Sequence, residues 1–493
     1  MTFPYDNWRL KLDRDENPYQ TSYFAHSAIR NMDFDELSRF PNYNKIKEKL
    51  AKLYNIDKNS LFLTNGVLGA LKFVFEKYLD KNDEFYSYNP LPDYVLKSVK
   101  NFCKTRLIDC GLDFKFNYEE FLNGIDGAKI AYLSTPNVIT GEYIPLDYVK
   151  WLIENKPNTL FVVDCSYIDF VEDASFLDFV ELAKNHKNII LVKSYSSVYA
   201  LSGLDCAVVV ANDEVMDEIK KEVAVDEINI ISQNCLNSVL NDLKYLLELQ
   251  KNNKSAKELL YKGLADLNYK PYETNSNFIL CDFKNNCDFC YEKLKKNGIL
   301  TKIFSNNPTL STHLKITIPK LSGVKYMLEV LAVKDILIFD FDELVFKDEK
   351  LNISLELLDE LEEKYDLVLL IKNSENEARK ALEGLDINKY FSYILTLSNF
   401  KKEADFILYS LQHIKNHCRY NSLKYFTASA ENTMAANELK VETVGVLTGN
   451  NDNIMINNFK HLGVKTILNS ANEINDFLEK NSQLDNVNSQ IVL

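Results

Sequence analysis

An unbroken apolar run that ends in a carboxylate constrains the fold of this chain more than any other stretch. Residues 160–163 are Leu, Phe, Val and Val, and Asp164 follows them directly. Such a run is typical of a strand buried on both faces inside a parallel sheet. In open α/β sheets, ligands bind beyond the carboxyl ends of the strands. We therefore predict an α/β fold with a mostly parallel sheet and Asp164 at its functional edge.

A second run of the same kind lies in the last third of the sequence. Residues 336–339 lead into Asp340, and Asp342 stands two positions further on. A chain of 493 residues is long enough for two or three domains with separate cores. We therefore expect a second α/β domain over residues 333–480, followed by a polar, loosely held tail over residues 481–493.

Charge and composition exclude several classes of partner. The formal net charge of −14 argues against nucleic acids and membrane surfaces, which both favour a basic face. No stretch approaches about 18 consecutive apolar residues, so we expect no transmembrane span. The first six residues show no basic segment followed by an apolar one, which predicts no secretory signal. The nine cysteines, odd in number and scattered, indicate reduced thiols in a cytoplasmic protein.

Cys281, Cys287 and Cys290 form the one group of cysteines that lie close together in the sequence. Two roles are open for them, as ligands of a zinc ion or as thiols packed in the core. A zinc site needs a fourth ligand at suitable spacing, and the neighbouring sequence offers none. We favour packing, because free cysteine is among the most buried residue types.

Eight short segments in the first two-thirds of the chain follow one family pattern. They are residues 12–19, 39–42, 61–66, 90–94, 133–141, 160–170, 192–205 and 313–318. Together they resemble the fold-type I aminotransferases that depend on pyridoxal phosphate (PLP), in the histidinol-phosphate aminotransferase branch. The resemblance implies a three-layer sandwich over residues 1–332, with a large domain at about 30–250 and a small lobe from 1–29 and 251–332. It also implies a homodimer and, as cofactor, PLP or its amino form PMP.

The resemblance assigns roles to individual residues. Asp164 would pair with the pyridine nitrogen of the cofactor, and the ring of Tyr94 would stack on the pyridine. Tyr19 would reach the cofactor phosphate of the neighbouring subunit, and Lys315 stands where an arginine binds the substrate carboxylate. The full set is Tyr19, Gly66, Tyr94, Asp164, Tyr167, Ser194 and Ser197 for the cofactor, and Asn17 and Lys315 for the substrate. A small phosphorylated or amino-acid-like ligand would match such a site.

Four departures from the pattern fall on the cofactor site. Ser197 stands where the family has the lysine that forms an imine with PLP, and a hydroxyl cannot form that bond. Asp205 replaces the arginine that binds the cofactor phosphate, residues 67–69 replace polar phosphate-binding residues, and Val138 replaces the asparagine that contacts the ring oxygen. Lys193 lies four residues before Ser197, roughly 13 Å away along a strand, so we do not expect it to substitute. These losses predict that covalent PLP catalysis is gone.

The segment around Asp340 and Asp342 has companions further along the chain. Residues 367–374, 425–436 and 444–449 follow it at the spacing of a second family pattern. Together they resemble the haloacid-dehalogenase-like (HAD) hydrolases, with a Rossmann-like α/β fold. The resemblance implies that Asp340 attacks phosphorus, that Asp342 is the acid/base, and that both lie at a magnesium site.

This second pattern also has departures. Lys372 replaces a hydroxyl residue, and Ala428 and Asn432 replace the two carboxylates that hold magnesium. Glu343 replaces a glycine after Asp342. The sequence offers Lys401 or Lys402 as the lysine that offsets phosphate charge, and it leaves no room for a cap domain of usable size.

Three hypotheses for function follow. The first is a catalytically degenerate fusion of an aminotransferase-like and a HAD-like domain with a binding, scaffold or regulatory role. The second is an active PLP- or PMP-dependent enzyme that acts on a small phosphorylated amino compound. The third is a residual HAD phosphatase that uses Asp340 and Asp342. Cofactor absorbance separates the first two, and magnesium-dependent release of phosphate tests the third.

Overall fold

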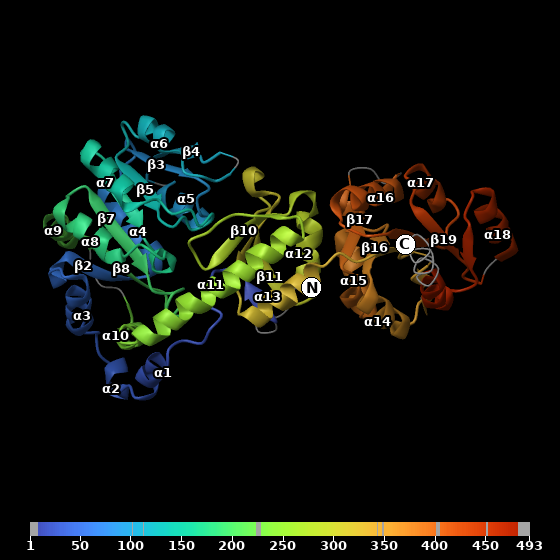
Figure 1. Ribbon diagram of the computed structural model, residues 1–493, viewed down its shortest axis with the longest axis horizontal. Coiled ribbons are helices and arrows are strands. Elements are labelled where there is room, and N and C mark those ends of the chain that lie inside the picture. The colour runs from blue at the N-terminus through green and yellow to red at the C-terminus, as the bar shows by residue number, and fades with distance from the viewer. Residues whose placement is uncertain are drawn as a thin grey trace, which may run out of the picture.

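The structure is a computed structural model that describes residues 8–481, apart from residues 101, 112, 223–227, 343, 348–349, 401–404 and 450–451. Glu343, Lys401, Lys402 and the tail from residue 482 onward therefore lie outside the described residues. Three large β-sheets organise the chain and follow one another along the long axis of the molecule (Figure 1).

The first sheet has seven strands in the order β2-β8-β7-β6-β5-β3-β4. The strands are β2 (Leu61–Asn65), β3 (Glu84–Asn89), β4 (Lys104–Asp109), β5 (Ile130–Ser134), β6 (Leu160–Asp164), β7 (Ile189–Ser194) and β8 (Cys206–Ala211). All neighbours pair in parallel except β8, which is antiparallel to β2 and β7. The predicted mostly parallel sheet is thus confirmed, with β6 in its middle.

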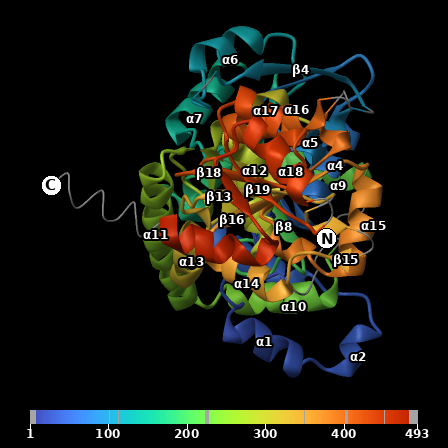
Figure 2. The same ribbon diagram turned by 90° about the vertical axis from the view of Figure 1, so that its right-hand side faces the viewer.

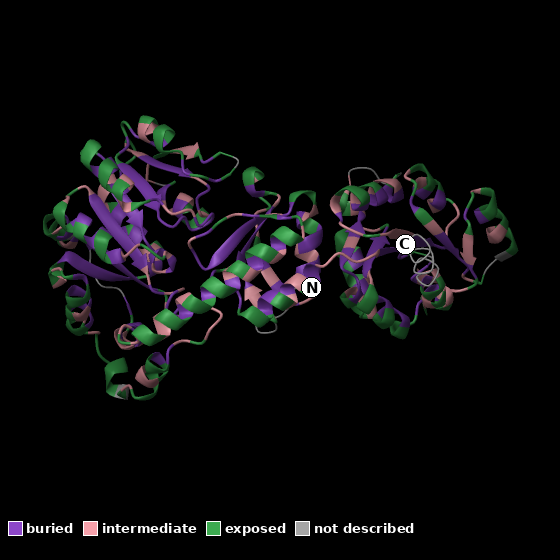
Figure 3. Ribbon diagram, viewed as in Figure 1, coloured by how far each residue is buried: buried purple, intermediate pink, exposed green. Residues whose placement is uncertain are grey.

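Helices cover both faces of this sheet. Helices α4 (Gly66–Tyr78), α5 (Asp93–Val99) and α9 (Asp213–Glu222) pack on one face, and α3 (Asn44–Tyr54), α6 (Tyr118–Gly124), α7 (Leu146–Asn155) and α8 (Phe176–Asn185) on the other. Buried strands lie between helices whose outer faces are exposed (Figure 3). Local sequence sets the helix starts: α8 begins at Ser175, whose side chain accepts a hydrogen bond from the Leu177 amide.

The second sheet forms a small lobe and includes the N-terminal arm. Its order is β1-β11-β12-β10-β9, with β1 (Leu10–Leu12), β9 (Lys270–Pro271), β10 (Phe278–Asp282), β11 (Ile299–Ile303) and β12 (His313–Thr317). Helices α12 (Cys287–Lys296) and α13 (Leu321–Leu331) complete the lobe. Helix α11 (Leu243–Asp266) joins it to the large sheet. Strand β1 pairs in parallel with β11 at the edge of this sheet.

The third sheet is entirely parallel and has six strands in the order β17-β16-β13-β18-β19-β20. They are β13 (Ile336–Asp340), β16 (Asp366–Ile371), β17 (Tyr393–Thr396), β18 (Leu423–Thr427), β19 (Glu442–Val446) and β20 (Thr466–Leu468). Helices α14 (Leu355–Lys364) and α15 (Glu375–Leu385) cover one face, and α16 (Phe406–His417) and α17 (Asn432–Glu438) the other. Figure 2 looks onto this end of the molecule.

The small lobe and the third sheet share a continuous apolar core. Leu294 on α12 and Ile338 on β13 belong to the same buried cluster. The same contact holds a buried ion pair, in which Lys293 Nζ lies 2.6 Å from Asp366 Oδ2. Lys293 is 5% exposed and Asp366 2%. The third sheet is therefore packed onto the small lobe through both an apolar contact and a desolvated ion pair.

Two further expectations from the sequence concern the grouped cysteines and membrane-spanning helices. Cys281, Cys287 and Cys290 are all buried in the apolar cluster of the small lobe. Within the described residues, no group of three or more histidine, cysteine, aspartate and glutamate side chains is arranged to hold a metal ion. Among the described helices, none combines the length and the apolar character needed to cross a membrane.

Candidate functional site

Asp164 lies at the carboxyl end of β6 and is fully buried. Its Oδ2 accepts a hydrogen bond from the Tyr132 hydroxyl at 3.0 Å. Its Oδ1 accepts from the backbone N–H of Ser166 at 3.0 Å and from the Ser166 hydroxyl at 2.5 Å. Burial raises the pKa of Asp164, and these hydrogen bonds partly offset the increase. Donors of the chain itself therefore bind both oxygens of the predicted ring partner.

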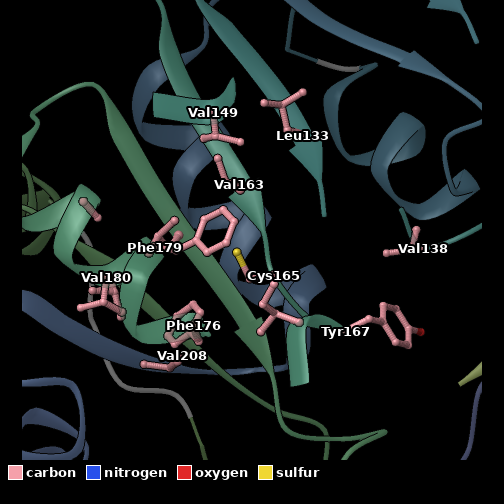
Figure 4. Packing of buried hydrophobic residues seen from close by; sticks show 14 of the residues in the cluster. Leu133, Val138, Val149, Val163, Cys165, Tyr167, Phe176, Phe179, Val180 and Val208 are labelled. Carbon is pink, nitrogen blue, oxygen red and sulfur yellow. The ribbon is translucent and has the colours of Figure 1, made fainter. Parts of the chain in front are cut away.

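Tyr167 follows β6 and belongs to the same buried cluster as Phe176 and Phe179, with its ring pointing away from these two side chains (Figure 4). Its hydroxyl donates to Asp15 Oδ2 at 2.8 Å. The same Asp15 oxygen lies 2.5 Å from Lys315 Nζ, and Lys315 also donates to the Val138 carbonyl at 2.7 Å. Asp15 comes from the N-terminal arm, Lys315 from β12 of the small lobe, and Tyr167 from the large domain. One buried carboxylate thus links three parts of the molecule.

Lys315 is the residue predicted to bind a substrate carboxylate. It is 8% exposed, and desolvation lowers its pKa while the charge of Asp15 partly offsets the decrease. The backbone N–H of Asp15 also donates to Thr317 Oγ1 at 2.9 Å, which fixes the arm beside β12. The Lys315 ammonium, which a substrate carboxylate would need as its partner, is therefore already paired with the Asp15 carboxylate.

The N-terminus of α4 is the predicted binding place of the cofactor phosphate. Gly66 is the first residue of α4 and has a φ of +68°. A Cβ atom at Gly66 would lie only 2.2 Å from Asp205 Oδ2, so this carboxylate packs directly on the glycine. Ser196 Oγ donates to Asp205 Oδ1 at 3.2 Å. Helix N-termini favour anions, and here the anion belongs to the chain.

Lys193 does not take the place of the missing lysine. Its ammonium lies 2.6 Å from Asp169 Oδ2 and 4.9 Å from the centroid of the Phe176 ring. Lys193 is 4% exposed. Within the described residues, the hydrogen bonds to Asp164 come from Tyr132 and Ser166, and Lys193 makes none of them.

The other residues predicted to bind the cofactor differ in their burial and in their contacts. Ser197 is half-buried, and Ser194 donates its backbone N–H to Ser166 Oγ at 3.2 Å, which brings it next to a partner of Asp164. Burial raises the pKa of the Tyr94 hydroxyl, and the nearby carboxylates of Asp164 and Asp15 raise it further. Tyr94 is nevertheless 36% exposed, so its ring is partly open to solvent.

The arm residues Asn17 and Tyr19 make their contacts with residues other than Asp164. Asn17 Nδ2 donates to the Val198 carbonyl at 3.2 Å and to the Tyr245 hydroxyl at 3.3 Å. The ring of Tyr19 is half-buried, with Lys320 Nζ 5.3 Å from its centroid. Asn17 therefore anchors the arm to the segment that carries Ser197.

Asp340 at the end of β13 is the counterpart of Asp164 in the third sheet. It is 4% exposed, and three donors bind it: Tyr425 OH at 2.5 Å, Thr427 Oγ1 at 2.5 Å and Asn432 Nδ2 at 3.0 Å. Burial raises the pKa of Asp340 to about 6, against the opposing effect of these hydrogen bonds and of the Lys372 charge. Both oxygens of the predicted nucleophile therefore carry hydrogen bonds.

Asp342 and Lys372 lie at the exposed rim of the same edge. Asp342 Oδ2 accepts from the backbone N–H of Lys372 at 3.3 Å. The Lys372 ammonium lies 3.5 Å from Asn432 Oδ1. Lys372 thus brings a positive charge next to Asn432, at a position where the second resemblance predicts a carboxylate.

Several residues of these networks were not predicted. Tyr132 and Tyr425 lie in apolar strand segments, and nothing in those segments indicates that their hydroxyls hydrogen-bond an aspartate. Asp169 lies in the short 3-10 helix Ile168–Phe170 after β6, and it meets Lys193 only through the fold. Asp15 lies in the segment 12–19 of the family pattern, but the sequence assigned it no role. Its ion pair with Lys315 joins residues that are 300 positions apart in the chain.

Comparison with known proteins supports the first resemblance. The family profile for aminotransferase class I and II matches residues 10–331. The chain is similar to a histidinol-phosphate aminotransferase of Brachyspira hyodysenteriae, with 26% identity over 64% of this chain and 89% of the relative. It is also similar to the histidinol-phosphate aminotransferase of Methanocaldococcus jannaschii, with 26% identity over 65% and 88% of the two chains.

Solved structures show the same fold for this part. A putative histidinol-phosphate aminotransferase of Erwinia carotovora atroseptica superimposes with a TM-score of 0.61 at 23% identity and covers 65% of this chain and 94% of its own. The histidinol-phosphate aminotransferase of Sinorhizobium meliloti, solved in complex with pyridoxal-5'-phosphate, also gives 0.61, at 16% identity and 66% and 91% coverage. These likenesses concern the first two sheets.

Proposed function

The chain belongs to the aminotransferase class I and II family, and we propose that it has lost covalent PLP chemistry and acts as a binding or regulatory member of that family. The observation that carries this proposal is the Asp205 carboxylate on Gly66 at the N-terminus of α4. In the family, an arginine at this position binds the cofactor phosphate. A carboxylate there repels a phosphate instead of binding it.

The residues of this site do not fit PLP. When bound, PLP supplies an electron sink, and only the buried Asp164 retains the type that supports it. Ser197 provides no amine for an imine, and Asp205 places a negative charge at the phosphate position. Val138 contributes a backbone carbonyl to Lys315, and its side chain cannot hydrogen-bond a ring oxygen.

The substrate side of the site supports the same proposal. The predicted carboxylate-binding residue, Lys315, is already paired with Asp15 at 2.5 Å. A substrate carboxylate would have to displace Asp15, which would leave that carboxylate buried without its cation. Active aminotransferase chemistry on a small phosphorylated amino compound, the activity that the relatives' names suggest, would need both anion positions open.

Binding calorimetry of the full-length protein with PLP tests the proposal. The wild type should show no saturable binding, whereas Ser197→Lys combined with Asp205→Arg should bind PLP at least roughly tenfold more tightly than Ser197→Lys alone. The matched control combines Ser197→Lys with Asp205→Asn, which removes the negative charge without adding a cation. Its affinity for PLP should lie between those of the other two variants. Saturable PLP binding by the wild type, undiminished in Ser197→Ala, would contradict the proposal.

We further propose that the chain is a homodimer. Helices α1 (Tyr23–Arg30) and α2 (Phe34–Leu37) extend from the body of the molecule (Figure 1). Tyr23 is 76% exposed, Ile29 49% and Phe40 fully exposed, an apolar surface that a second copy would cover. Sedimentation should give a dimer for the wild type and a monomer for the combined variant Tyr23→Ser and Ile29→Ser.

For the third sheet, we propose a HAD-like domain over residues 333–480, joined to the aminotransferase-like residues 1–332. Support comes from the parallel sheet, from Asp340 at the end of its inner strand β13, and from the ends of β16 and β18 that bring Lys372 and Thr427 beside it. A residual phosphatase is the second candidate function, favoured by Asp340 and Asp342 at one edge.

The hydrogen bonds on both oxygens of Asp340 weigh against that second function, and Ala428 and Asn432 leave the proposed magnesium site without two carboxylates. Release of phosphate from p-nitrophenyl phosphate, measured with and without Mg²⁺, tests it. A magnesium-dependent rate that disappears in Asp340→Asn, but persists in the control Asp359→Asn on α14, would support the phosphatase.

A further inference from the structure

A cavity of about 290 Å³ lies in the large domain, apart from the predicted cofactor site. Helices α3, α8 and α11 and α10 (Ile230–Val239) surround it, together with the loop after β6 and the end of β7. None of the residues predicted to contact the cofactor or the substrate lines it. Its volume is at the lower end of the range for small-molecule sites.

The polar part of the cavity is the ion pair between Lys193 and Asp169. Lys193 is 4% exposed, and within the described residues its single hydrogen-bond acceptor is Asp169 Oδ2. An ammonium carries three N–H donors, so the pair and the Phe176 ring leave donor capacity on Lys193. Asp169 has a side-chain exposure of 19%, and its ion pair with Lys193 is made through Oδ2. The pair therefore offers both a donor and an acceptor to the cavity.

The other acidic residues around the cavity already have partners. Asp242 accepts from Ser22 Oγ at 2.5 Å and from the Tyr245 N–H at 3.0 Å. Glu172 pairs with Lys254 at 2.6 Å. The chain thus uses these carboxylates, and the charged groups left for a ligand among the residues that line the cavity are those of Lys193 and Asp169.

The remaining wall of the cavity is mostly apolar. Leu53, Phe176, Leu240 and Leu246 line it, and Leu243, which is 66% exposed, stands where the wall meets solvent. An apolar side chain of four or so carbons would bury its surface there, at about 25 cal/mol per Å².

We propose that this cavity binds a small zwitterion with an aliphatic side chain, that is, a free aliphatic amino acid. The ligand carboxylate would accept from Lys193, and the ligand ammonium would donate to Asp169. The pair carries no net charge, so a ligand with a single charge would desolvate one member of the pair without compensating the other. A zwitterion compensates both.

The cavity also touches the segment that carries Ser197. Tyr195 and Tyr199 line it, and the Tyr195 hydroxyl bonds to Tyr54 of α3. Ser196 and Asp205 of the same segment lie at α4. A bound ligand would therefore contact the segment that anchors the cofactor in the relatives, but from the side opposite to Asp205's contact with α4.

Calorimetry of the full-length protein with three ligands that share one isobutyl group tests the proposal. The ligands are L-leucine, which is a zwitterion, 3-methylbutylamine, which lacks the carboxylate, and 4-methylpentanoate, which lacks the ammonium. Leucine should bind roughly tenfold or more tightly than either of the others. Equal binding of the amine or of the acid would overturn the assignment, as would no saturable binding of leucine.

Variants locate the binding. Lys193→Met and Asp169→Asn should each weaken leucine binding roughly tenfold or more. Lys187→Met, which breaks the exposed pair with Glu214 on the same domain, is the matched control and should leave it unchanged. Because Lys193→Met also leaves a carboxylate without its cation, Leu246→Trp fills the cavity with the ion pair intact. Leucine binding that survives Leu246→Trp would place the ligand elsewhere and overturn the proposal.

Discussion

Strands β6 and β13 each end in a buried aspartate, but the charges around the two carboxylates differ. Tyr132 and Ser166 bind Asp164, and Tyr425, Thr427 and Asn432 bind Asp340. Both sheets thus place a carboxylate at the same point and saturate it with donors of the chain. The difference lies in the next residues along each edge.

Around Asp164, two expected cations are gone, since Ser197 stands for a lysine and Asp205 for an arginine. The cation that is kept, Lys315, is paired with the Asp15 carboxylate. Around Asp340, negative charge is missing instead. Ala428 and Asn432 stand where two carboxylates were expected, and Lys372 adds a positive charge. The parallel sheet therefore fixes where a functional aspartate stands, whereas the residues in the neighbouring loops decide which charge it can meet.

The largest expected effect contrasts the lysines of the two edges. Lys315→Met leaves Asp15 buried without its cation, and we expect it to lower the free energy of unfolding by roughly 3–5 kcal/mol. Lys372→Met removes an exposed lysine and should cost less than about 1 kcal/mol. Denaturant unfolding of both variants measures the contrast. Lys302→Met, on the exposed position paired with Lys315, is the control, and an equal loss there would refute the buried-pair explanation.

The second effect is a pH dependence that belongs to Asp340. Its pKa of about 6 in the folded protein exceeds the usual unfolded value near 3.9. A raised carboxyl pKa favours folding while the group is protonated, so this stabilisation is complete below about pH 4 and lost as the pH rises through about 6. The loss amounts to roughly 3 kcal/mol.

Asp340→Asn should remove this component. Hydrogen exchange of the β13 amides, compared between wild type and variant at several pH values, measures it. The difference in protection should change between pH 4 and 7 and be flat above that range. A difference that does not depend on pH would show that Asp340 is ionised like an exposed carboxyl.

The smallest effect compares the tyrosines that bind the two aspartates. Tyr132→Phe and Tyr425→Phe each remove one hydrogen bond to a buried carboxylate, and each should cost about 1.5–3 kcal/mol. Because the Tyr425 hydrogen bond lowers the pKa of Asp340, Tyr425→Phe should also move the pH midpoint upward. Tyr132→Phe should leave that midpoint unchanged. A shift of the midpoint in both variants would show that the surroundings of Asp164 and Asp340 are not independent.

Much of the fold followed from the sequence, because apolar runs identify buried strands. The positions of Asp164 and Asp340 at strand ends are confirmed for that reason. Helix α11, which begins at Leu243, gives a weaker sequence signal. Its first half bridges two lobes and buries few residues, among them Leu249 and Asn253. Apolar residues therefore recur less regularly at the helical spacing there, which weakens the sequence signal for a helix.

The contacts of the site were harder to predict than its location. The strand that carries Lys193 could be predicted, but its partner Asp169, which the short 3-10 helix Ile168–Phe170 supplies, could not. The pairing of Asp15 with Lys315 depends on how the arm joins β11, and no local pattern records that. Departures from the family motifs were informative here, since Ser197 and Asp205 both remove positive charge from the site.

The central claim is that this aminotransferase relative forms no covalent bond with PLP. The most direct test incubates the purified protein with PLP, reduces it with borohydride, and searches every lysine by mass spectrometry for a pyridoxyl adduct. We predict no specific adduct in the wild type and a single one at position 197 in the combined variant Ser197→Lys and Asp205→Arg. A stoichiometric adduct on one lysine of the wild type, Lys193 above all, would contradict the claim.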